Sequence, residues 1–192
     1  MNRKMILAGI LVGLFLISMI AIPAYAKPDN KVPFTISGFS IKAPKADLRI
    51  VGDDTITISR TYEDGIMSLT YTLGTEVYYV KAYIGGNIEF NYKTMQGNAL
   101  FKFQMDFYAK RLSVTVDNPV IGTLEGTTVA KFTDRMEPGI FTGTGMQVGG
   151  HGTGIMKGVT TKCEGTYYPF TIPGTSIVTQ GISYSGVAIV ND

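Results

Sequence analysis

The single histidine and the single cysteine of this chain both lie in one glycine-rich segment, residues 141–165. Eight glycines fall between Gly143 and Gly165, and His151 stands between Gly150 and Gly152. One imidazole and one thiol cannot supply the four nitrogen or sulfur ligands of a tetrahedral metal site. The acidic residues do not follow the spacing of a calcium loop. We therefore expect neither a metal ion nor a cofactor.

Other catalytic patterns are also missing from the sequence. The glycine-rich segment matches neither phosphate-loop spacing, and no G-x-S-x-G nucleophile motif occurs in the chain. His151 is expected to be an exposed loop residue, with an acid or base role in a pocket as the alternative. Cys163 is expected to be a small buried side chain, with a reactive or intermolecular thiol as the alternative. Glycoside chemistry by a pair of carboxylates remains an open alternative. By default we expect the strand carboxylates on outer faces (Glu76, Glu89, Asp106, Glu125 and Glu164).

The segments that must position these residues are predicted to be β-strands. Apolar and polar residues alternate over residues 67–73, 87–93, 101–107 and 112–117, which gives each strand one apolar and one wet face. Short links at Asp64-Gly65, Gly85-Gly86, 96–98 and 109–111 predict hairpin turns between them. Residues 55–117 are thus predicted to form six successive strands of an up-and-down meander.

Two segments depart from this simple alternation. Residues 76–84 are apolar on both faces, which predicts either a strand covered on its second side or an aromatic wall that faces a ligand. Near the start, Phe34 and Ile36 share one parity and Phe39 and Ile41 the other. This switch predicts a β-bulge at Gly38.

About ten strands are expected between residues 27 and 192, with further candidates at 127–135, 140–148, 153–168 and 177–190. Closure would remove the exposed edges of such a sheet. We therefore predict an all-β fold with a single antiparallel up-and-down β-barrel of about 8–10 strands, with a β-sandwich as the alternative.

The first 26 residues resemble an export signal. Arg3 and Lys4 precede an uncharged apolar run over residues 5–22, and an Ala-x-Ala pattern ends at Ala26. The chain is expected to be exported to the periplasm, cell surface or exterior, with residues 27–192 as one domain. An uncleaved membrane anchor at residues 5–22 is the alternative. The signal holds two of the 17 basic and none of the 15 acidic residues. The mature chain is therefore neutral, which argues against a nucleic-acid partner.

The glycine-rich segment also carries a resemblance. Residues 148–159, Val-Gly-Gly-His-Gly-Thr-Gly-Ile-Met-Lys-Gly-Val, with Gly165 beyond them, resemble the Gly-Gly-Thr-Gly stretch of the allene oxide cyclase and dirigent barrels. The resemblance implies a lipocalin-like barrel that holds apolar or phenolic ligands. Some members of those families steer cyclisation or radical coupling. His151 interrupts the motif, and no catalytic residue of the family can be carried over.

These observations favour an exported, non-enzymatic binder of an apolar or phenolic small molecule. The alternatives are an isomerase or cyclase that acts in a barrel pocket, a cell-surface structural module, and a lipid-embedded barrel. Inward aromatics would fill or line the interior. The candidate ligand-binding residues are Phe90, Tyr92, Phe101, Phe103, Phe107 and His151.

Overall fold

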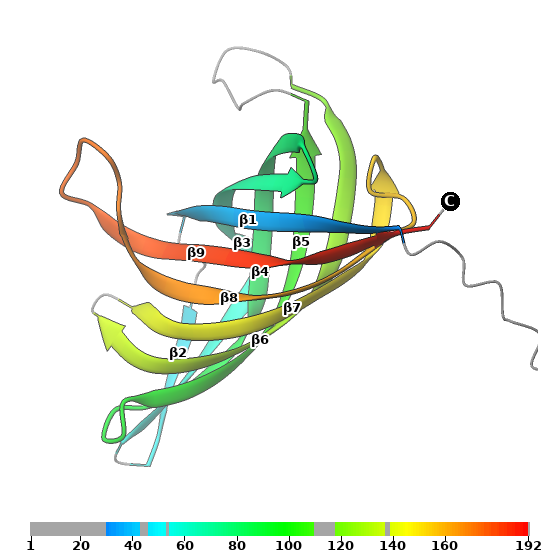
Figure 1. Ribbon diagram of the computed structural model, residues 1–192. Coiled ribbons are helices and arrows are strands. Elements are labelled where there is room, and N and C mark those ends of the chain that lie inside the picture. Colours follow the sequence, from blue (N-terminus) through cyan, green and yellow to red (C-terminus); the bar gives the residue numbers. More distant parts are fainter. Residues whose placement is uncertain (1–29, 43–45, 53, 110–117, 137–138, 192) are drawn as a thin grey trace, which may run out of the picture.

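The computed structural model describes residues 30–42, 46–52, 54–109, 118–136 and 139–191. The predicted signal, residues 1–26, and the predicted strand at 112–117 lie outside these residues. None of the described residues belongs to a helix that could cross a membrane. The described strands (Figure 1) are β1 (Lys31–Lys42), β2 (Ala46–Val51), β3 (Thr55–Leu73), β4 (Glu76–Asn91), β5 (Gln96–Tyr108), β6 (Val120–Met136), β7 (Ile140–Gly154), β8 (Val159–Thr171) and β9 (Val178–Val190).

Strand β1 closes the sheet into a barrel. It pairs with β9 along one edge and with β3 along the other, and every pairing is antiparallel. From β3 to β9 each strand lies beside its neighbours in the sequence. The result is a closed eight-stranded barrel with β2 as an additional strand. The predicted antiparallel up-and-down barrel is thereby confirmed, and the sandwich alternative is wrong.

The barrel wall splits beside β3, because this strand has two partners in succession along one edge. Residues 66–73 of β3 pair with β1, whereas residues 55–60 pair with β2. The pairing with β4 shifts register between Arg60 and Gly65, where the two halves of β3 meet. Among the described strands, β2 has no partner on its far edge. One end of the barrel is therefore open between β2 and the β8–β9 pair.

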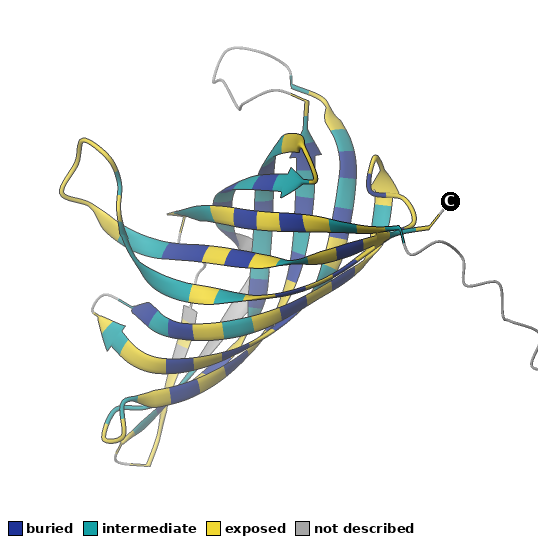
Figure 2. Ribbon diagram, in the orientation of Figure 1, coloured by how far each residue is buried: buried dark blue, intermediate teal, exposed yellow. Residues whose placement is uncertain are grey.

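The interior is packed in two layers. Burial alternates along the strands (Figure 2), as expected when one face of each strand points inward. One layer lies at the end where the termini of β1 and β9 meet, and includes Leu69, Tyr71 and Phe107. There the β7–β8 turn places Met156, which is fully buried, in the end of the barrel. The second layer, around Phe90, Phe132 and Phe141, lies toward the end with the split wall.

Two predicted turns are in fact bends within long strands. Strand β3 runs through Asp64-Gly65, and β4 runs through Gly85-Gly86, which was expected to be a two-residue hairpin loop. A Cβ at Gly86 would collide with the backbone carbonyl of Leu100 on β5. Glycine here permits close strand approach and not chain reversal. The segment predicted as six strands is therefore three long strands, as far as its residues are described.

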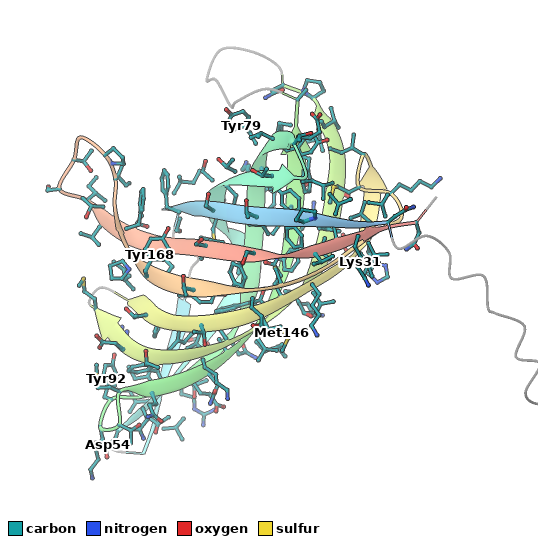
Figure 3. All side chains as sticks on the ribbon, viewed as in Figure 1. Lys31, Asp54, Tyr79, Tyr92, Met146 and Tyr168 are labelled. Atoms are coloured by element: carbon teal, nitrogen blue, oxygen red, sulfur yellow. The ribbon has the colours of Figure 1, made fainter. Side chains whose placement is uncertain are left out.

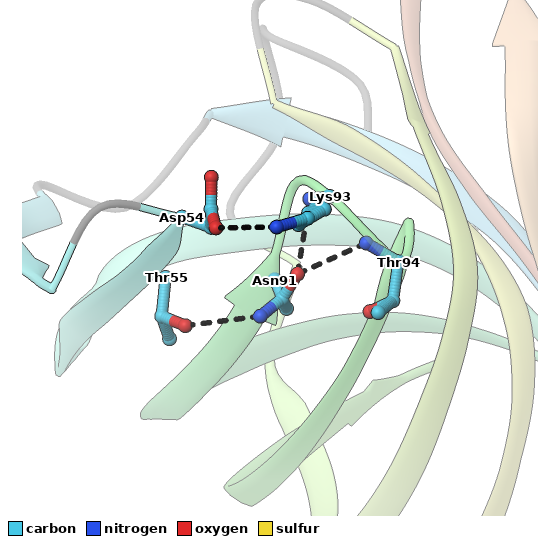
Figure 4. A network of polar contacts seen from close by, with 5 residues as sticks. All are labelled: Asp54, Thr55, Asn91, Lys93 and Thr94. Carbon is cyan, nitrogen blue, oxygen red and sulfur yellow. Dashed lines mark hydrogen bonds and ion pairs between the residues drawn. The ribbon is translucent and has the colours of Figure 1, made fainter.

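The true turn between β4 and β5 lies at residues 92–95, slightly before the predicted link at 96–98. Asn91 organises it (Figure 4): its Oδ1 accepts hydrogen bonds from the backbone N–H groups of Lys93 and Thr94, both at 2.9 Å. Its Nδ2 donates to Oγ1 of Thr55 on β3 at 3.2 Å. Such side-chain capping of a turn is a property of asparagine that needs no glycine.

The expected bulge at Gly38 is wrong. Strand β1 keeps its register with β3 and β9 through Gly38, and the shift with β3 comes only between Ser40 and Lys42. The inward-facing positions of β1 therefore continue in regular alternation at Gly38 and Ser40. Phe39 consequently faces outward, where its ring stacks on that of Phe170 with centroids 4.9 Å apart. The apolar parity changes because an aromatic side chain packs on the outer face of the barrel.

The glycine-rich segment forms β7 and the first half of β8. Its inward glycines make room for large side chains from other strands. A Cβ at Gly145 would collide with the Tyr184 hydroxyl, and a Cβ at Gly165 would lie 2.5 Å from the Tyr184 ring. Bare backbone at these positions lets an aromatic ring from β9 pack directly against β7 and β8. The glycines serve packing of the barrel interior.

This packing predicts opposite outcomes for two alanine substitutions on β7. Gly143→Ala places a methyl group against the backbone of Lys131 and Phe132 on β6, whereas a Cβ at Gly150 has open space around it. We expect Gly143→Ala to lower the free energy of unfolding by about 2 kcal/mol or more. Gly150→Ala should change it by less than about 0.5 kcal/mol. Urea unfolding of both variants checks this, and equal stabilities would contradict the close approach at Gly143.

Candidate binding site

An apolar cavity of about 60 Å³ opens where the barrel wall splits. It lies between the two interior layers, and residues of β1, β3 and β9 form its mouth. Its wall combines aliphatic and aromatic side chains, and its rim is polar. The lining residues are Ser40, Lys42, Gly65, Ile66, Met67, Ile84, Ile88, Phe101, Phe132, Phe141, Tyr167 and Gln180.

Interlocked rings hold the aromatic wall of the cavity in place. Phe132 stacks on Phe141 with ring centroids 4.5 Å apart. Tyr167 meets Phe132 edge to face at 5.3 Å. Such pairs add about 0.5–1.5 kcal/mol each beyond their burial. The wall is therefore a preformed apolar surface and does not need a ligand to order it.

Gln180 fixes the rim where β7 and β8 separate. The ladder between these strands begins at Gly143 and Tyr167, so the earlier residues of β7 lack a partner from β8. The Gln180 side chain reaches from β9 to Phe141 instead. Its Oε1 accepts from the Phe141 N–H at 2.8 Å, and its Nε2 donates to the Phe141 carbonyl at 3.0 Å. Nε2 also lies 3.2 Å from the carbonyl of Tyr168, so the amide joins three strands.

The β1 side of the rim carries Ser40 and Lys42. The Thr179 hydroxyl donates a hydrogen bond of 2.8 Å to the Ser40 carbonyl, which ties β9 to β1 at the last point before they separate. Ser40 is half-buried and Lys42 is exposed. A positive charge thus stands at the mouth of an apolar cavity.

A cation also covers the aromatic layer at the open end. The Arg135 guanidinium lies 5.0 Å from the ring centre of Tyr92 and 5.8 Å from that of Phe141. Figure 3 shows Tyr92 near this end of the barrel, close to the tips of β4 and β5. Cation–π contacts of this kind are favourable by about 0.5–2 kcal/mol. Arg135 therefore anchors the outer part of the layer.

The structure separates the predicted ligand-binding residues into three groups. Phe101 lines the cavity, and Phe90 and Tyr92 belong to the same aromatic layer. Phe103 and Phe107 lie in the other layer, where they are buried and packed. His151 is exposed on β7, paired with Glu125 of β6, and is not among the cavity residues. The carboxylates of Glu76, Glu89, Glu125 and Glu164 are on exposed residues, and Asp106 is half-buried.

Several lining residues had no clear signal in the sequence. Phe132 and Phe141 lie on predicted strands, and their alternating apolar pattern could have identified them as interior. Ser40, Lys42 and Gln180 are polar and are brought together only by the splitting of the wall. Strand alternation predicts inward positions but not where a wall opens.

Burial dominates the chemistry of the interior hydroxyl and thiol groups. Cys163 is buried, as predicted, and burial raises the pKa of its thiol to about 12. Burial also raises the pKa of Tyr167 to about 12, against a smaller lowering effect of Tyr184. The pKa values of Tyr71 and Tyr184 are raised further by the same cause. All four groups are protonated near neutral pH, so they can donate hydrogen bonds but are poor bases or nucleophiles.

Within the described part of the chain, no group of three or more His, Cys, Asp or Glu residues could hold a metal ion.

Comparison with protein-family models, curated proteins and solved structures found no match to this chain. The resemblance of residues 148–165 to the allene oxide cyclase and dirigent barrels therefore stays a prediction.

The buried tyrosines predict loss of stability at alkaline pH. The Tyr71 hydroxyl is buried and has no hydrogen-bond partner among the described residues. Unfolded tyrosine ionises near pH 10, whereas the folded protein holds these protons to higher pH. The contribution of these tyrosines to the free energy of unfolding should therefore be constant below about pH 9 and fall above pH 10. Each buried tyrosine contributes about 1.4 kcal/mol per pH unit to that fall.

Tyr71→Phe tests this account. The variant should be as stable as the wild type at pH 8, or more stable by up to about 1 kcal/mol, because it removes an unpaired buried hydroxyl. Its stability should also fall less steeply above pH 10. Urea unfolding across this pH range measures both effects. A loss of more than about 2 kcal/mol at pH 8 would show that the hydroxyl makes a favourable interaction.

Proposed function

We propose that this chain is an exported, non-enzymatic binding protein for an apolar or phenolic small molecule, held at the split in the barrel wall. The observation that supports this most is the preformed apolar cavity that opens between β1, β3 and β9. Its mouth carries a hydroxyl, an amide and one ammonium group. Apolar walls with a few placed polar groups are typical of small-molecule sites.

The size of the cavity limits what can enter. Sites for drug-sized ligands measure about 300–1,000 Å³, and a cavity of about 150 Å³ holds a benzene molecule. The volume here is about 60 Å³. We therefore propose that only the narrow apolar end of the ligand enters, while its remainder lies at the mouth between β1 and β9.

The rim favours an anionic group on the outer part of the ligand. Lys42 is the charged residue of the cavity lining, and Ser40 and Gln180 offer hydrogen-bonding groups beside it. A carboxylate at the mouth would meet the Lys42 ammonium without being buried, which avoids the cost of desolvating the charge. Fatty acids and phenolic acids share this combination of apolar body and carboxylate.

A binding role fits the lining residues better than an isomerase or cyclase. The ionisable residues that line the cavity are Lys42 and Tyr167. Tyr167 keeps its proton because burial raises its pKa to about 12. General acid–base catalysis requires groups whose pKa lies near the working pH. The phenol is suited to donating a hydrogen bond to a bound ligand.

Filling the cavity should weaken binding strongly. Ser40→Phe places a ring at the mouth, and we expect it to weaken binding of dodecanoate or para-coumarate at least tenfold. Thr35→Phe is the matched control, because Thr35 is exposed on the same strand. Displacement of anilinonaphthalene sulfonate, with calorimetry on any ligand found, measures the affinities. If correctly folded Ser40→Phe binds as the wild type does, the cavity is not the site.

Removing the charge at the rim should discriminate between ligands. Lys42→Gln should weaken dodecanoate binding about threefold and leave dodecanol binding unchanged, because an exposed ion pair contributes little. Lys102→Gln, an exposed lysine on β5, is the control. An equal loss for the acid and the alcohol would contradict a carboxylate at Lys42.

A further inference from the structure

The outer wall of the barrel contains a second hollow, of about 490 Å³, which is separate from the cavity at the split. It lies across β1, β3, β4 and β8 on the opposite side of the wall from the packed interior. Leu69 and Val80, which also line it, are buried, and the outward-facing side chains are of two kinds. Aromatic rings come from Phe39, Tyr79, Tyr168 and Phe170, and hydroxyl groups come from Ser37, Ser68 and Thr70.

The strand order sets the arrangement of these groups. Phe39 pairs with Ser68 of β3, and Thr70 of β3 pairs with Tyr79 of β4. The rings of Phe39 and Tyr79 thus project from strands that are two spacings, or about 10 Å, apart. The hydroxyl-bearing residues of β3 lie on the strand between them. In Figure 3, Tyr79 and Tyr168 lie on opposite sides of β1.

The aromatic side of the hollow is rigid without a ligand. Phe39 and Phe170 stack with an interplanar angle of 10°. Tyr168 lies over Gly181 of β9, where a Cβ would come within 2.6 Å of its ring. Its hydroxyl lies 3.5 Å from the Ile182 carbonyl. Gly181 beneath the Tyr168 ring, and the stacking of Phe39 on Phe170, hold these aromatic side chains in place. Binding of a ligand would therefore cost little side-chain entropy.

From this geometry we infer that the hollow binds an uncharged oligosaccharide. The lining contains no charged side chain, which disfavours an ionic ligand. Sugar rings present apolar C–H faces that can lie on aromatic rings, and their hydroxyl groups can exchange hydrogen bonds with serine and threonine. A purely apolar ligand would cover the Ser37, Ser68 and Thr70 hydroxyls and leave them unpaired, at a cost in affinity.

This inference also accounts for one outward residue of segment 76–84, Tyr79, which lines the hollow. Val80 and Ala82 point inward and are buried, whereas Tyr79 is half-buried on the outer face. The outer tyrosine is explained by a ligand surface and not by a covering segment among the described residues. The site is independent of the proposed cavity ligand, since the two share no lining residue.

The test is calorimetric titration of the whole protein with cellohexaose, chitohexaose, laminarihexaose and mannohexaose. We expect at least one to bind with millimolar or tighter affinity, and Tyr168→Ala or Tyr79→Ala to weaken it at least tenfold. Tyr83→Ala is the matched control, because Tyr83 lies on the outer face of β4 outside the hollow. Its affinity should stay within about twofold of the wild type.

Thr70→Val separates a saccharide from an apolar partner. It removes a hydroxyl and keeps the shape of the side chain, so it should weaken sugar binding about fivefold. The proposal is overturned if none of the four saccharides binds at millimolar concentration, or if Tyr168→Ala binds as the wild type does. It is also overturned if Thr70→Val strengthens binding. Sedimentation that shows a dimer lost in Tyr168→Ala would assign the hollow to a second copy of the chain and contradict the sugar site.

Discussion

The whole structure depends on a difference in strand length: β1 closes the barrel against β3, and β3 is the longer strand. Strand β1 has 12 residues and β3 has 19. Backbone groups in a sheet must be paired or solvated, and β1 can pair only with residues 66–73 of β3. Residues 55–60 of β3 pair instead with β2, which is not a neighbour of β9 in the sheet. Closure at one end therefore forces an opening at the other.

That opening explains why the barrel is filled at one end and accessible at the other. Where the wall is complete, Met156 and the surrounding side chains leave a packed interior. Where β1 ends, Ser40 and Lys42 stand opposite Gln180 and a cavity remains. The outer hollow depends on the same strand in a different way, because the regular register of β1 through Gly38 turns Phe39 outward. Strand β1 thus shapes both candidate surfaces.

The class of fold could be predicted from alternation alone, because every strand of a barrel has one inward face. Strand length could not be predicted in the same way. Gly85-Gly86 has the composition of a hairpin turn, yet it lies in the middle of β4, where its missing Cβ atoms admit β5. Local composition does not distinguish a chain reversal from a close strand contact. That distinction depends on which distant strand lies alongside.

The candidate site shows the same limit. Phe101 was predicted from its inward parity on an alternating strand, and it does line the cavity. Gln180 was not predicted, because its role comes from the separation of β7 and β8, a property of the assembled sheet. The change of parity at Phe39 predicts a backbone bulge, whereas its cause is an aromatic ring that packs on the outer wall.

Amide hydrogen exchange followed residue by residue tests the central claim, that β1 closes the barrel and β2 does not. Exchange of buried ladder amides requires opening of the strand, whereas an unpaired edge exchanges readily. The amides of residues 34–39 on β1 should exchange as slowly as those of β8, since both strands are paired on two sides. The amides of β2 should exchange much faster. Exchange of β1 as fast as β2, or protection of β2 equal to that of β8, would contradict the split wall.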